Sequence, residues 1–283
     1  MAKRLLAWAV IVHNGPMTSA GFSHVDATEA GGGSAWWDAD AAQYYADHGA
    51  HLGDADLLWC PEGVRESEAG LLGDVRGRRV LEVGCGAAQG SRWTMTAGAH
   101  AVGLDFSRGM LRVGRELNRR TGIDVPLVLG DARALPFADG AFDLAFSAFG
   151  ALAFVPELGA VHREVARVLR PGGRWVLATT HPMRWCFPDD PGVDQRALTV
   201  VRAYFDATPY AEREGGQLVY AEFPHTVAEH INSLVDAGFA ADRAWEPRPE
   251  PGQAIRWGAW SPERGALIPG TLILAASRAT PPR

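Results

Sequence analysis

The chain has 283 residues, of which 47% are hydrophobic and 21% charged, a composition typical of an ordinary globular protein with a sizeable core. Its 33 acidic and 27 basic residues give a net charge of −6. A protein that binds duplexes through a general surface needs a cationic excess, so we expect no nucleic-acid partner.

Lysine and cysteine usage restricts the chemistry further. Lys3 is the only lysine, which excludes Schiff-base catalysis and the phosphate-binding P-loop, because both need an internal lysine. Cys60, Cys85 and Cys186 are far apart, odd in number and without a CxxC spacing. We therefore expect neither a disulfide scaffold nor a thiolate zinc site, and we expect a cytoplasmic location.

Residues 1–35 are predicted to form a disordered tail. The apolar run from Leu5 to Val12 is at the short end for a secretion signal, and no convincing cleavage site follows it. It is also far shorter than the ~20 residues of a membrane-spanning helix, and no later apolar run is longer and free of charge. We expect no membrane partner. Whether Met1 or Met17 is the natural start stays open.

Residues 36–73 are predicted to form a helical cap. This segment is rich in Trp, Tyr, His and Leu and turns at Pro61. Its aromatic side chains are candidates for a lid over a ligand, although an aromatic core that joins the cap to the next domain explains them equally well. The candidates are Trp36, Tyr44, Tyr45 and Trp59.

Residues 74–182 alternate short apolar runs with amphipathic stretches, which indicates βα units and a mostly parallel sheet. The predicted strands are Val80–Val83, Ala101–Asp105, Val125–Gly130, Phe142–Ser147 and Trp175–Thr180. Two helices between them present apolar faces that include Met110, Leu111 and Leu117 in one case and Leu158, Val161, Val165 and Val168 in the other.

Residues 183–224 interrupt this alternation for about forty residues, longer than the usual connection of ~4 to 6, and we expect an inserted substrate cap. Within it, Leu198–Tyr204 and Leu218–Phe223 are predicted to pair as an antiparallel ribbon. In residues 225–283, Thr226 has capping-box spacing to Glu229 and begins a helix. The strands Ala241–Glu246 and Thr271–Ala276 then complete the core.

The predicted fold is therefore α/β: a doubly wound, mostly parallel, Rossmann-like sheet of seven strands. A helical N-terminal cap precedes this core, and a substrate-covering segment is inserted after its fifth strand.

The strongest chemical signal is the segment from Val80 to Gly90, a strand that runs into a glycine turn and then a helix. A Gly-x-Gly turn alone is weak evidence. However, a second strand ends in Asp105 about twenty residues later, and a third ends at Asp131. The carboxyl ends of parallel strands lie along one edge of the sheet, where ligands collect at the switch point of strand order. We expect Glu82, Asp105 and Asp131 to converge there.

These motifs resemble those of the class I S-adenosylmethionine-dependent methyltransferases, particularly bacterial small-molecule methyltransferases. The resemblance covers Val80 to Gly173 and includes Leu135-Pro136-Phe137 and Pro171-Gly172-Gly173. It implies S-adenosylmethionine as the cofactor. The residues implied to bind it are Glu82, Gly84 and Gly86 at the methionine end, Asp105 at the ribose, Asp131 and Ala132 at the adenine, and Ser147 in the floor of the cleft. The chain departs from the family at Ala88, where a third glycine is common, although Gly90 follows.

Methyl transfer is an in-line displacement that needs a sulfonium held beside a nucleophile in a water-poor cleft, and it requires no metal. A general base helps only when the acceptor carries a proton. His181 follows the fifth strand directly and is the candidate for this base or for acceptor binding. The alternative is that His181 packs in the turn before Pro182.

Other aromatic and histidine residues are weaker candidates. Trp185 and Tyr204 lie in the insert that would cover the acceptor, but a surface ribbon with its own small cluster explains them too. His48 and His51 have a spacing that suits a metal, yet no third ligand is evident, so we expect no metal site. Cys85 in the glycine turn is expected to be a packing residue.

The sequence thus predicts a methyltransferase that acts on a small-molecule acceptor. Two alternatives stay open: a catalytically silent protein that binds the cofactor and regulates, and an NAD-dependent oxidoreductase, whose GxGxxG fingerprint the chain lacks. The acceptor atom (oxygen, nitrogen, sulfur or carbon) and the oligomeric state are not written in the motifs.

Overall fold

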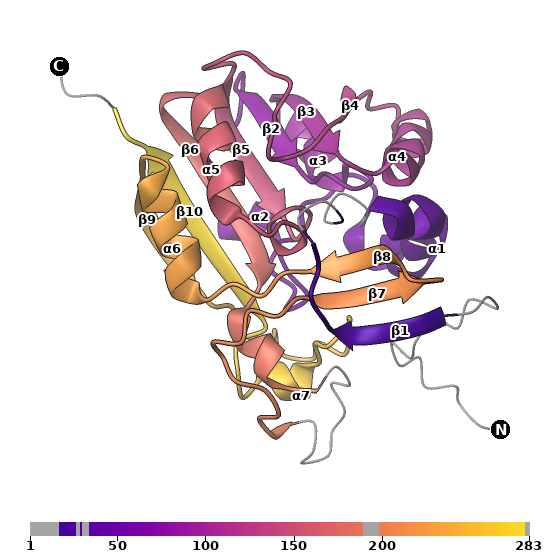
Figure 1. Ribbon diagram of the computed structural model, residues 1–283. Coiled ribbons are helices and arrows are strands. Elements are labelled where there is room, and N and C mark those ends of the chain that lie inside the picture. Colours follow the sequence, from indigo (N-terminus) through magenta and orange to yellow (C-terminus); the bar gives the residue numbers. More distant parts are fainter. Residues whose placement is uncertain (1–16, 27–28, 30–33, 189–197, 281–283) are drawn as a thin grey trace.

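The structure, a computed structural model, describes residues 17–26, 29, 34–188 and 198–280 (Figure 1). Its helices are α1 (Ser34–Leu52), α2 (Glu66–Ala69), α3 (Gln89–Thr96), α4 (Arg108–Thr121), α5 (Leu158–Val168), α6 (Val227–Asp236) and α7 (Pro262–Gly265), with the 3-10 turns η1 (Leu152–Phe154) and η2 (Pro182–Cys186). Its strands are β1 (Met17–Phe22), β2 (Arg79–Val83), β3 (His100–Asp105), β4 (Leu127–Leu129), β5 (Phe142–Ala148), β6 (Leu169–Thr180), β7 (Tyr210–Glu214), β8 (Gln217–Glu222), β9 (Phe239–Trp245) and β10 (Thr271–Arg278).

The larger sheet has seven strands in the order β4-β3-β2-β5-β6-β10-β9. The pairs from β4 to β6 are parallel, whereas β10 runs antiparallel to both β6 and β9. Strand order reverses between β2 and β5, so the switch point lies at the carboxyl ends of these two strands. The predicted seven-stranded, mostly parallel sheet is confirmed.

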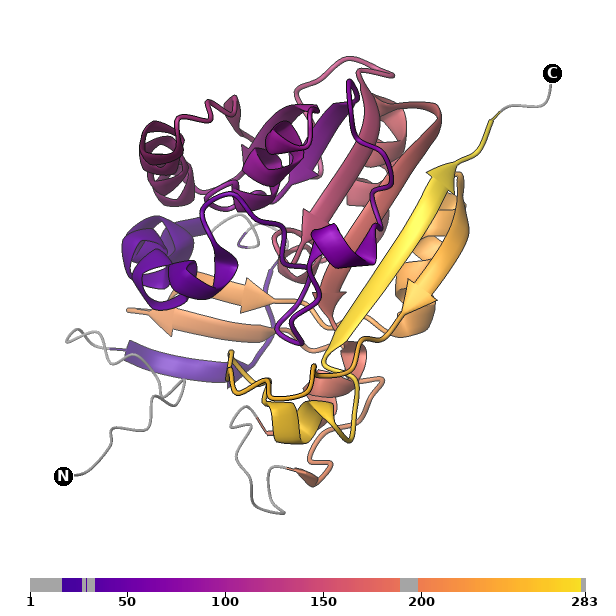
Figure 2. The same ribbon diagram turned by 180° about the vertical axis from the view of Figure 1, so that it is seen from behind.

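Helices cover both faces of this sheet (Figures 1 and 2). On one face, Val161 and Val165 of α5 and Leu234 of α6 are fully buried in one apolar cluster. On the other face, Trp93 of α3 packs against a cluster that contains Trp59 and other residues of the segment before β2. Because each face is covered, the strands are apolar on both sides, which explains their nearly continuous burial. In the described part of the chain, no helix is both long and apolar enough to cross a membrane.

A histidine cluster lies where α5 and α6 meet the sheet. His162 is fully buried, and its Nδ1 accepts a 3.2 Å hydrogen bond from Nε1 of Trp175. The ring of His230 lies 5.7 Å from that of His225 and is also buried. Burial lowers the pKa of both His162 and His230 to about 3.

This cluster predicts an acid-sensitive fold. A histidine titrates near 6.5 in the unfolded chain, so below that pH the unfolded chain binds more protons and the free energy of unfolding decreases until about pH 3. Urea unfolding at pH 7.5, 6.5 and 5.5 should show this decrease, and His162→Gln, which does not titrate, should make it shallower. An unchanged pH dependence in His162→Gln would contradict the role of His162.

Helix α1 docks on the N-terminus of α4. Asp38 of α1 accepts hydrogen bonds from Oγ of Ser107 at 2.7 Å and from the backbone N–H of Gly109 at 2.9 Å. A Cβ on Gly109 would lie 2.4 Å from the carbonyl oxygen of Asp38, so only glycine permits this approach. The contact fixes the position of α1 beside the carboxyl edge of the sheet.

The smaller sheet, in the order β1-β7-β8, is antiparallel throughout and lies beside α1 (Figure 1). Its hairpin turns at Gly215 and Gly216, which have φ of +56° and +84°, and a Gly-Gly pair is typical of a two-residue hairpin. Two predictions are wrong here. Residues 17–22 form an edge strand and not a disordered tail, whereas the apolar run from Leu5 to Val12 lies outside the described residues.

The second wrong prediction concerns the ribbon. The partner of β8 is β7, and Leu198–Tyr204 forms no strand. The side chain of Asp206 accepts hydrogen bonds from the N–H and Oγ1 of Thr208, and Arg202 donates to Asp206 and to two backbone carbonyls. These local bonds stabilise a turn where the sequence analysis placed an extended strand.

Candidate functional site

Two adjoining cavities lie at the carboxyl edge of the large sheet. The smaller, of about 120 Å³, is lined by the motif residues Glu82, Gly84, Gly86 and Asp105. The larger, of about 520 Å³, lies between α1, the β7–β8 hairpin and the segment before β10. Seven residues line both cavities: Trp37, Tyr44, Leu52, Leu58, Ala148, Phe149 and Phe154.

The glycine turn after β2 depends on a very close approach of two backbone segments. Gly84 has φ of +68°, and a Cβ there would lie 2.3 Å from the carbonyl carbon of Gly150. Gly86 has φ of +53° and lines the smaller cavity, and a Cβ there would lie 3.1 Å from the terminal methyl of Met110. Gly84 is needed for packing, and Gly86 leaves room for a ligand.

Ala88 stands where a third glycine is common in the family, and the structure shows which residue takes over the packing role of that glycine. Ala88 is fully buried and has φ of +61°, a left-handed conformation that is strained for a residue with a side chain. The close helix–strand packing falls to Gly90, where a Cβ would lie 2.7 Å from Oε1 of Glu82 and 2.9 Å from Phe146. Gly90 therefore provides the packing that a third glycine in the turn would give.

Two buried carboxylates face the smaller cavity. Oε2 of Glu82 accepts hydrogen bonds from both the N–H and Oγ of Ser91, and burial raises the pKa of Glu82 to about 7. The two carboxylate oxygens of Asp105 accept one bond each, from the N–H of Gly86 and of Ser107, both at 2.8 Å. Burial raises the pKa of Asp105 to about 6. A carboxylate oxygen has a second lone pair, so Asp105 can still accept bonds from ligand hydroxyls.

Three other predicted cofactor residues line neither cavity. Asp131 follows β4 and pairs with Arg133 at 2.7 Å, and Ala132 lies in the core. Ser147 is fully buried in β5, and among the described residues its Oγ has no hydrogen-bond partner. The roles of these three residues toward adenine and the cleft floor stay predictions.

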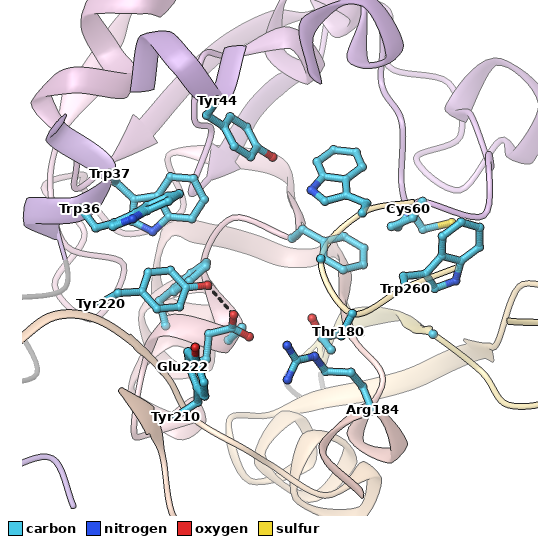
Figure 3. Close-up of a pocket in the computed structure, with 18 of the residues that line it drawn as sticks. Trp36, Trp37, Tyr44, Cys60, Thr180, Arg184, Tyr210, Tyr220, Glu222 and Trp260 are labelled. Atoms are coloured by element: carbon cyan, nitrogen blue, oxygen red, sulfur yellow. Dashed lines mark hydrogen bonds between the residues drawn. The ribbon is translucent and has the colours of Figure 1, made fainter. Parts of the chain in front are cut away.

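The larger cavity has aromatic walls and a polar side (Figure 3). Its lining includes Trp36, Trp37, Tyr44, Phe154, Tyr210, Tyr220, Trp257 and Trp260, together with Thr180, Arg184, Glu212 and Glu222. The hydroxyl of Tyr220 donates to Glu222, and that of Tyr210 donates to Glu212 at 3.1 Å. Burial and the neighbouring carboxylate of Glu222 raise the pKa of Tyr220, so its phenol keeps its proton at neutral pH.

Trp260 is held on the cavity wall by a buried carboxylate. Glu62 is fully buried, and it accepts hydrogen bonds from Nε1 of Trp260 at 3.1 Å and from Oγ1 of Thr271 at 2.7 Å. Gly270 makes room for the indole, because a Cβ there would lie 2.2 Å from Cδ1 of Trp260. The start of β10 thereby fixes this part of the wall.

Several predicted lid residues lie elsewhere. Trp36 and Tyr44 do line the larger cavity, and Tyr45 lines the smaller one while its hydroxyl bonds to Asp54. Trp59, however, is fully buried in the core and donates to Glu66 at 2.8 Å. As a buried indole with a satisfied N–H, it cannot act as a lid.

Trp185 and Tyr204 also line neither cavity. Trp185 is buried against Phe22 of β1, at a ring distance of 6.1 Å. The hydroxyl of Tyr204 accepts a bond from the N–H of Val227 at the start of α6. This packing favours the alternative of a small cluster apart from the cavities, and the contact of both residues with the acceptor stays a prediction.

His181 is held at both ring nitrogens. Its Nδ1 accepts a bond from the N–H of Met183 at 3.1 Å, which leaves the proton on Nε2 for a 2.9 Å bond to Glu246. Burial lowers the pKa of His181. The ring lines neither cavity, whereas its neighbour Thr180 lines the larger one. This geometry favours the packed alternative, and the role of His181 as a general base stays a prediction.

The histidines and cysteines of the site region have structural partners. His48 stacks on Trp257 with ring centroids 4.6 Å apart, and burial lowers the pKa of both His48 and His51. Burial raises the pKa of the thiols of Cys60 and Cys85, so neither is a thiolate at neutral pH. Within the described ranges, His, Cys, Asp and Glu do not gather in groups of three that could hold a metal ion.

The comparisons with known proteins agree with the motif residues. A family model described as a methyltransferase domain matches residues 80–173. A demethylmenaquinone methyltransferase of Listeria welshimeri is 34% identical over 189 residues, which cover 62% of this chain and 76% of that relative. A demethylmenaquinone methyltransferase of Corynebacterium kroppenstedtii is 38% identical over 138 residues, which cover 49% of this chain and 55% of that relative. The match therefore spans about half of the length of that relative. A structure of an S-adenosylmethionine-dependent methyltransferase from Mesorhizobium loti has a TM-score of 0.59 and 27% identity, and the match covers 77% of this chain and 100% of that one.

Proposed function

Because the chain belongs to the class I S-adenosylmethionine-dependent methyltransferase family, whose cofactor is S-adenosylmethionine, we propose that it transfers a methyl group from this cofactor to a small organic molecule. One observation carries the proposal: a cavity built from the glycine turn and two strand-end carboxylates shares a wall with a second cavity of about 520 Å³. The volume is within the ~300 to 1,000 Å³ of small-molecule sites.

The residues of the smaller cavity fit the cofactor. Asp105 would hold the ribose hydroxyls through its remaining lone pairs, and Glu82 and the open backbone of Gly86 would face the methionine end. Asp131 and the amide of Ala132 would hold the adenine. When bound, the cofactor supplies a methyl group on a sulfonium, which is activated for in-line displacement.

The acceptor would occupy the larger cavity with its apolar part against the aromatic walls. The polar side, with Glu222 and Arg184, would orient its polar atoms. In the transfer, the bond between the methyl carbon and the acceptor atom forms as the carbon–sulfur bond breaks, and the sulfonium becomes a neutral thioether. An acceptor that carries a proton must also lose it.

We assign the cover of the acceptor to residues 36–73 and 183–224, joined by residues 246–270. Helix α1, the β7–β8 hairpin and Trp257 belong to these segments and line the larger cavity. The free thiols of Cys60, Cys85 and Cys186 favour a reducing compartment, so we place the protein in the cytoplasm.

An isotopic assay tests the function. The protein would be incubated with S-adenosylmethionine labelled in its methyl group and a metabolite extract, with Asp105→Asn as the control. Label is expected in an organic product with wild type and to be greatly reduced with the control. Binding of the cofactor without transfer would favour a silent regulatory protein, and binding of NAD instead would favour an oxidoreductase.

A second assay decides the role of His181. From its two hydrogen bonds, we expect His181→Ala to lower the melting temperature and to change the single-turnover rate little once cofactor and acceptor are saturating. The opposite result would be a folded variant that keeps its cofactor affinity while its single-turnover rate falls by the ~10² to 10⁴-fold typical of a lost general base. That result would establish His181 as the base.

A further inference from the structure

The wall between the two cavities is mostly aromatic. Of the seven residues that line both cavities, four carry rings, and we call these four the aromatic partition: Trp37, Tyr44, Phe149 and Phe154. The other three shared residues are Leu52, Leu58 and Ala148, so no charged side chain belongs to this wall.

The rings of the partition are held in fixed orientations. The ring of Trp37 lies 5.3 Å from that of Tyr44 and 5.5 Å from that of Phe154, both edge-to-face. Phe149 has φ of +62°, and its N–H donates to the carbonyl of Ala178 at 2.9 Å. Left-handed backbone in a residue with a side chain is strained and persists where the surroundings fix it, often at a ligand site.

The course of the reaction places a cation at this wall. A methyl group that passes to an acceptor in the larger cavity must leave from the boundary between the cavities, and the sulfur that carries it is positively charged. The carboxylates of Glu82 and Asp105 line the smaller cavity but do not belong to the shared wall, and they already accept hydrogen bonds from the N–H groups of Ser91, Gly86 and Ser107. Among the seven residues of the shared wall, the aromatic rings are the side chains that can attract a positive charge.

We propose that the aromatic partition binds the sulfonium of S-adenosylmethionine through cation–π contacts, and that the protein therefore holds this cofactor more tightly than S-adenosylhomocysteine, whose sulfur is neutral. The inference rests on the proposed function. Its consequence is that transfer removes the charge that the partition binds, which weakens the hold on the spent cofactor and favours its release.

Calorimetry with three ligands tests this inference. S-adenosylmethionine and sinefungin, in which an amine replaces the methyl sulfonium, both carry a charge at this position, whereas S-adenosylhomocysteine does not. Wild type is expected to bind the two charged ligands about 2- to 30-fold more tightly than S-adenosylhomocysteine. This range corresponds to the free energy of a cation–π contact. Sinefungin tests whether a cation other than a sulfonium gains the same affinity at this position.

Matched variants locate the effect. Tyr44→Leu and Phe149→Leu should bring the affinity ratio of charged to neutral ligand toward one, whereas Tyr44→Phe, which keeps the ring, should retain it. Tyr210→Leu removes a ring that lines only the larger cavity and should leave the ratio unchanged. If a leucine variant does not fold, Phe154→Leu takes its place.

Two results would overturn the inference. One is a wild type that binds S-adenosylhomocysteine as tightly as the two charged ligands. The other is an unchanged ratio in the folded leucine variants. A wild type that binds none of the three ligands would defeat the proposed function, and the inference with it, so the two failures are distinguishable.

Discussion

Gly84→Ala should destabilise the protein by about 4 kcal/mol or more, a loss that few single substitutions reach, and should abolish cofactor binding. Two effects add at this position. The left-handed φ of +68° disfavours alanine by roughly 1–2 kcal/mol. The new Cβ would also lie 2.3 Å from the backbone of Gly150, so β2 and β5 would have to separate at their carboxyl ends.

Gly122→Ala is the matched control for Gly84→Ala. Gly122 follows α4 with φ of +70°, and a Cβ there would meet no atom within 4 Å. The free energy of unfolding of Gly122→Ala should therefore fall only by the conformational cost of a left-handed alanine, roughly 1–2 kcal/mol. This variant should keep its affinity for S-adenosylhomocysteine. Urea unfolding and calorimetry measure both quantities. Equal destabilisation by the two variants would refute the argument from the close backbone approach.

Asp105→Ala should weaken the binding of S-adenosylhomocysteine by about 10- to 150-fold for each ribose hydrogen bond that is lost, since bonds to a charged group contribute ~1.5–3 kcal/mol. Asp143→Ala is the control, because Asp143 pairs with Arg79 and Arg170 at the other end of β5 and lines neither cavity. An unchanged affinity in a folded Asp105→Ala variant would remove Asp105 from the site.

The affinity should also depend on pH through Asp105. Burial raises its pKa to about 6, and the ionised form is the better acceptor for hydroxyl groups. Binding should therefore weaken in wild type as pH falls through about 6, and Asp105→Asn should lack this component. Glu82 has a pKa raised to about 7, so its titration contributes a separate pH dependence of binding near pH 7. Asp105→Asn keeps Glu82 and should keep this contribution. Parallel pH profiles in the two proteins would contradict the assignment.

The core of the fold and the cofactor edge were predictable from the sequence because each rests on local patterns. Short apolar runs bounded by glycine or aspartate become β2, β3 and β5, and the helix after Thr226 begins with the capping box that its spacing indicates. The strand-end acids Glu82 and Asp105 meet because parallel strands end at one edge.

The walls of the larger cavity were less predictable because they depend on pairings between distant segments. Period-two spacing places Tyr210 and Glu212 on one face of β7, and Tyr220 and Glu222 on one face of β8. The Gly-Gly pair between these strands was the available signal. Trp257 comes from a long connection between β9 and β10 that the sequence analysis treated only as core.

Single side chains were misplaced where a buried partner decides their position. Trp59 looks like a lid residue in the sequence, but the carboxylate of Glu66 satisfies its N–H inside the core. His181 follows a strand end as a catalytic base would, yet Glu246, 65 residues later in the chain, bonds to its Nε2. No local pattern reveals such long-range partners.

The shared wall between the two cavities constrains how this protein can evolve or be re-engineered. A substitution at Glu222 or Trp260 alters the surroundings of one ligand, whereas a substitution at Trp37 alters those of both. New acceptor preferences are therefore accessible through the hairpin and the segment before β10 while the cofactor cavity stays intact. A library for altered specificity should randomise those segments and leave the four rings of the partition unchanged.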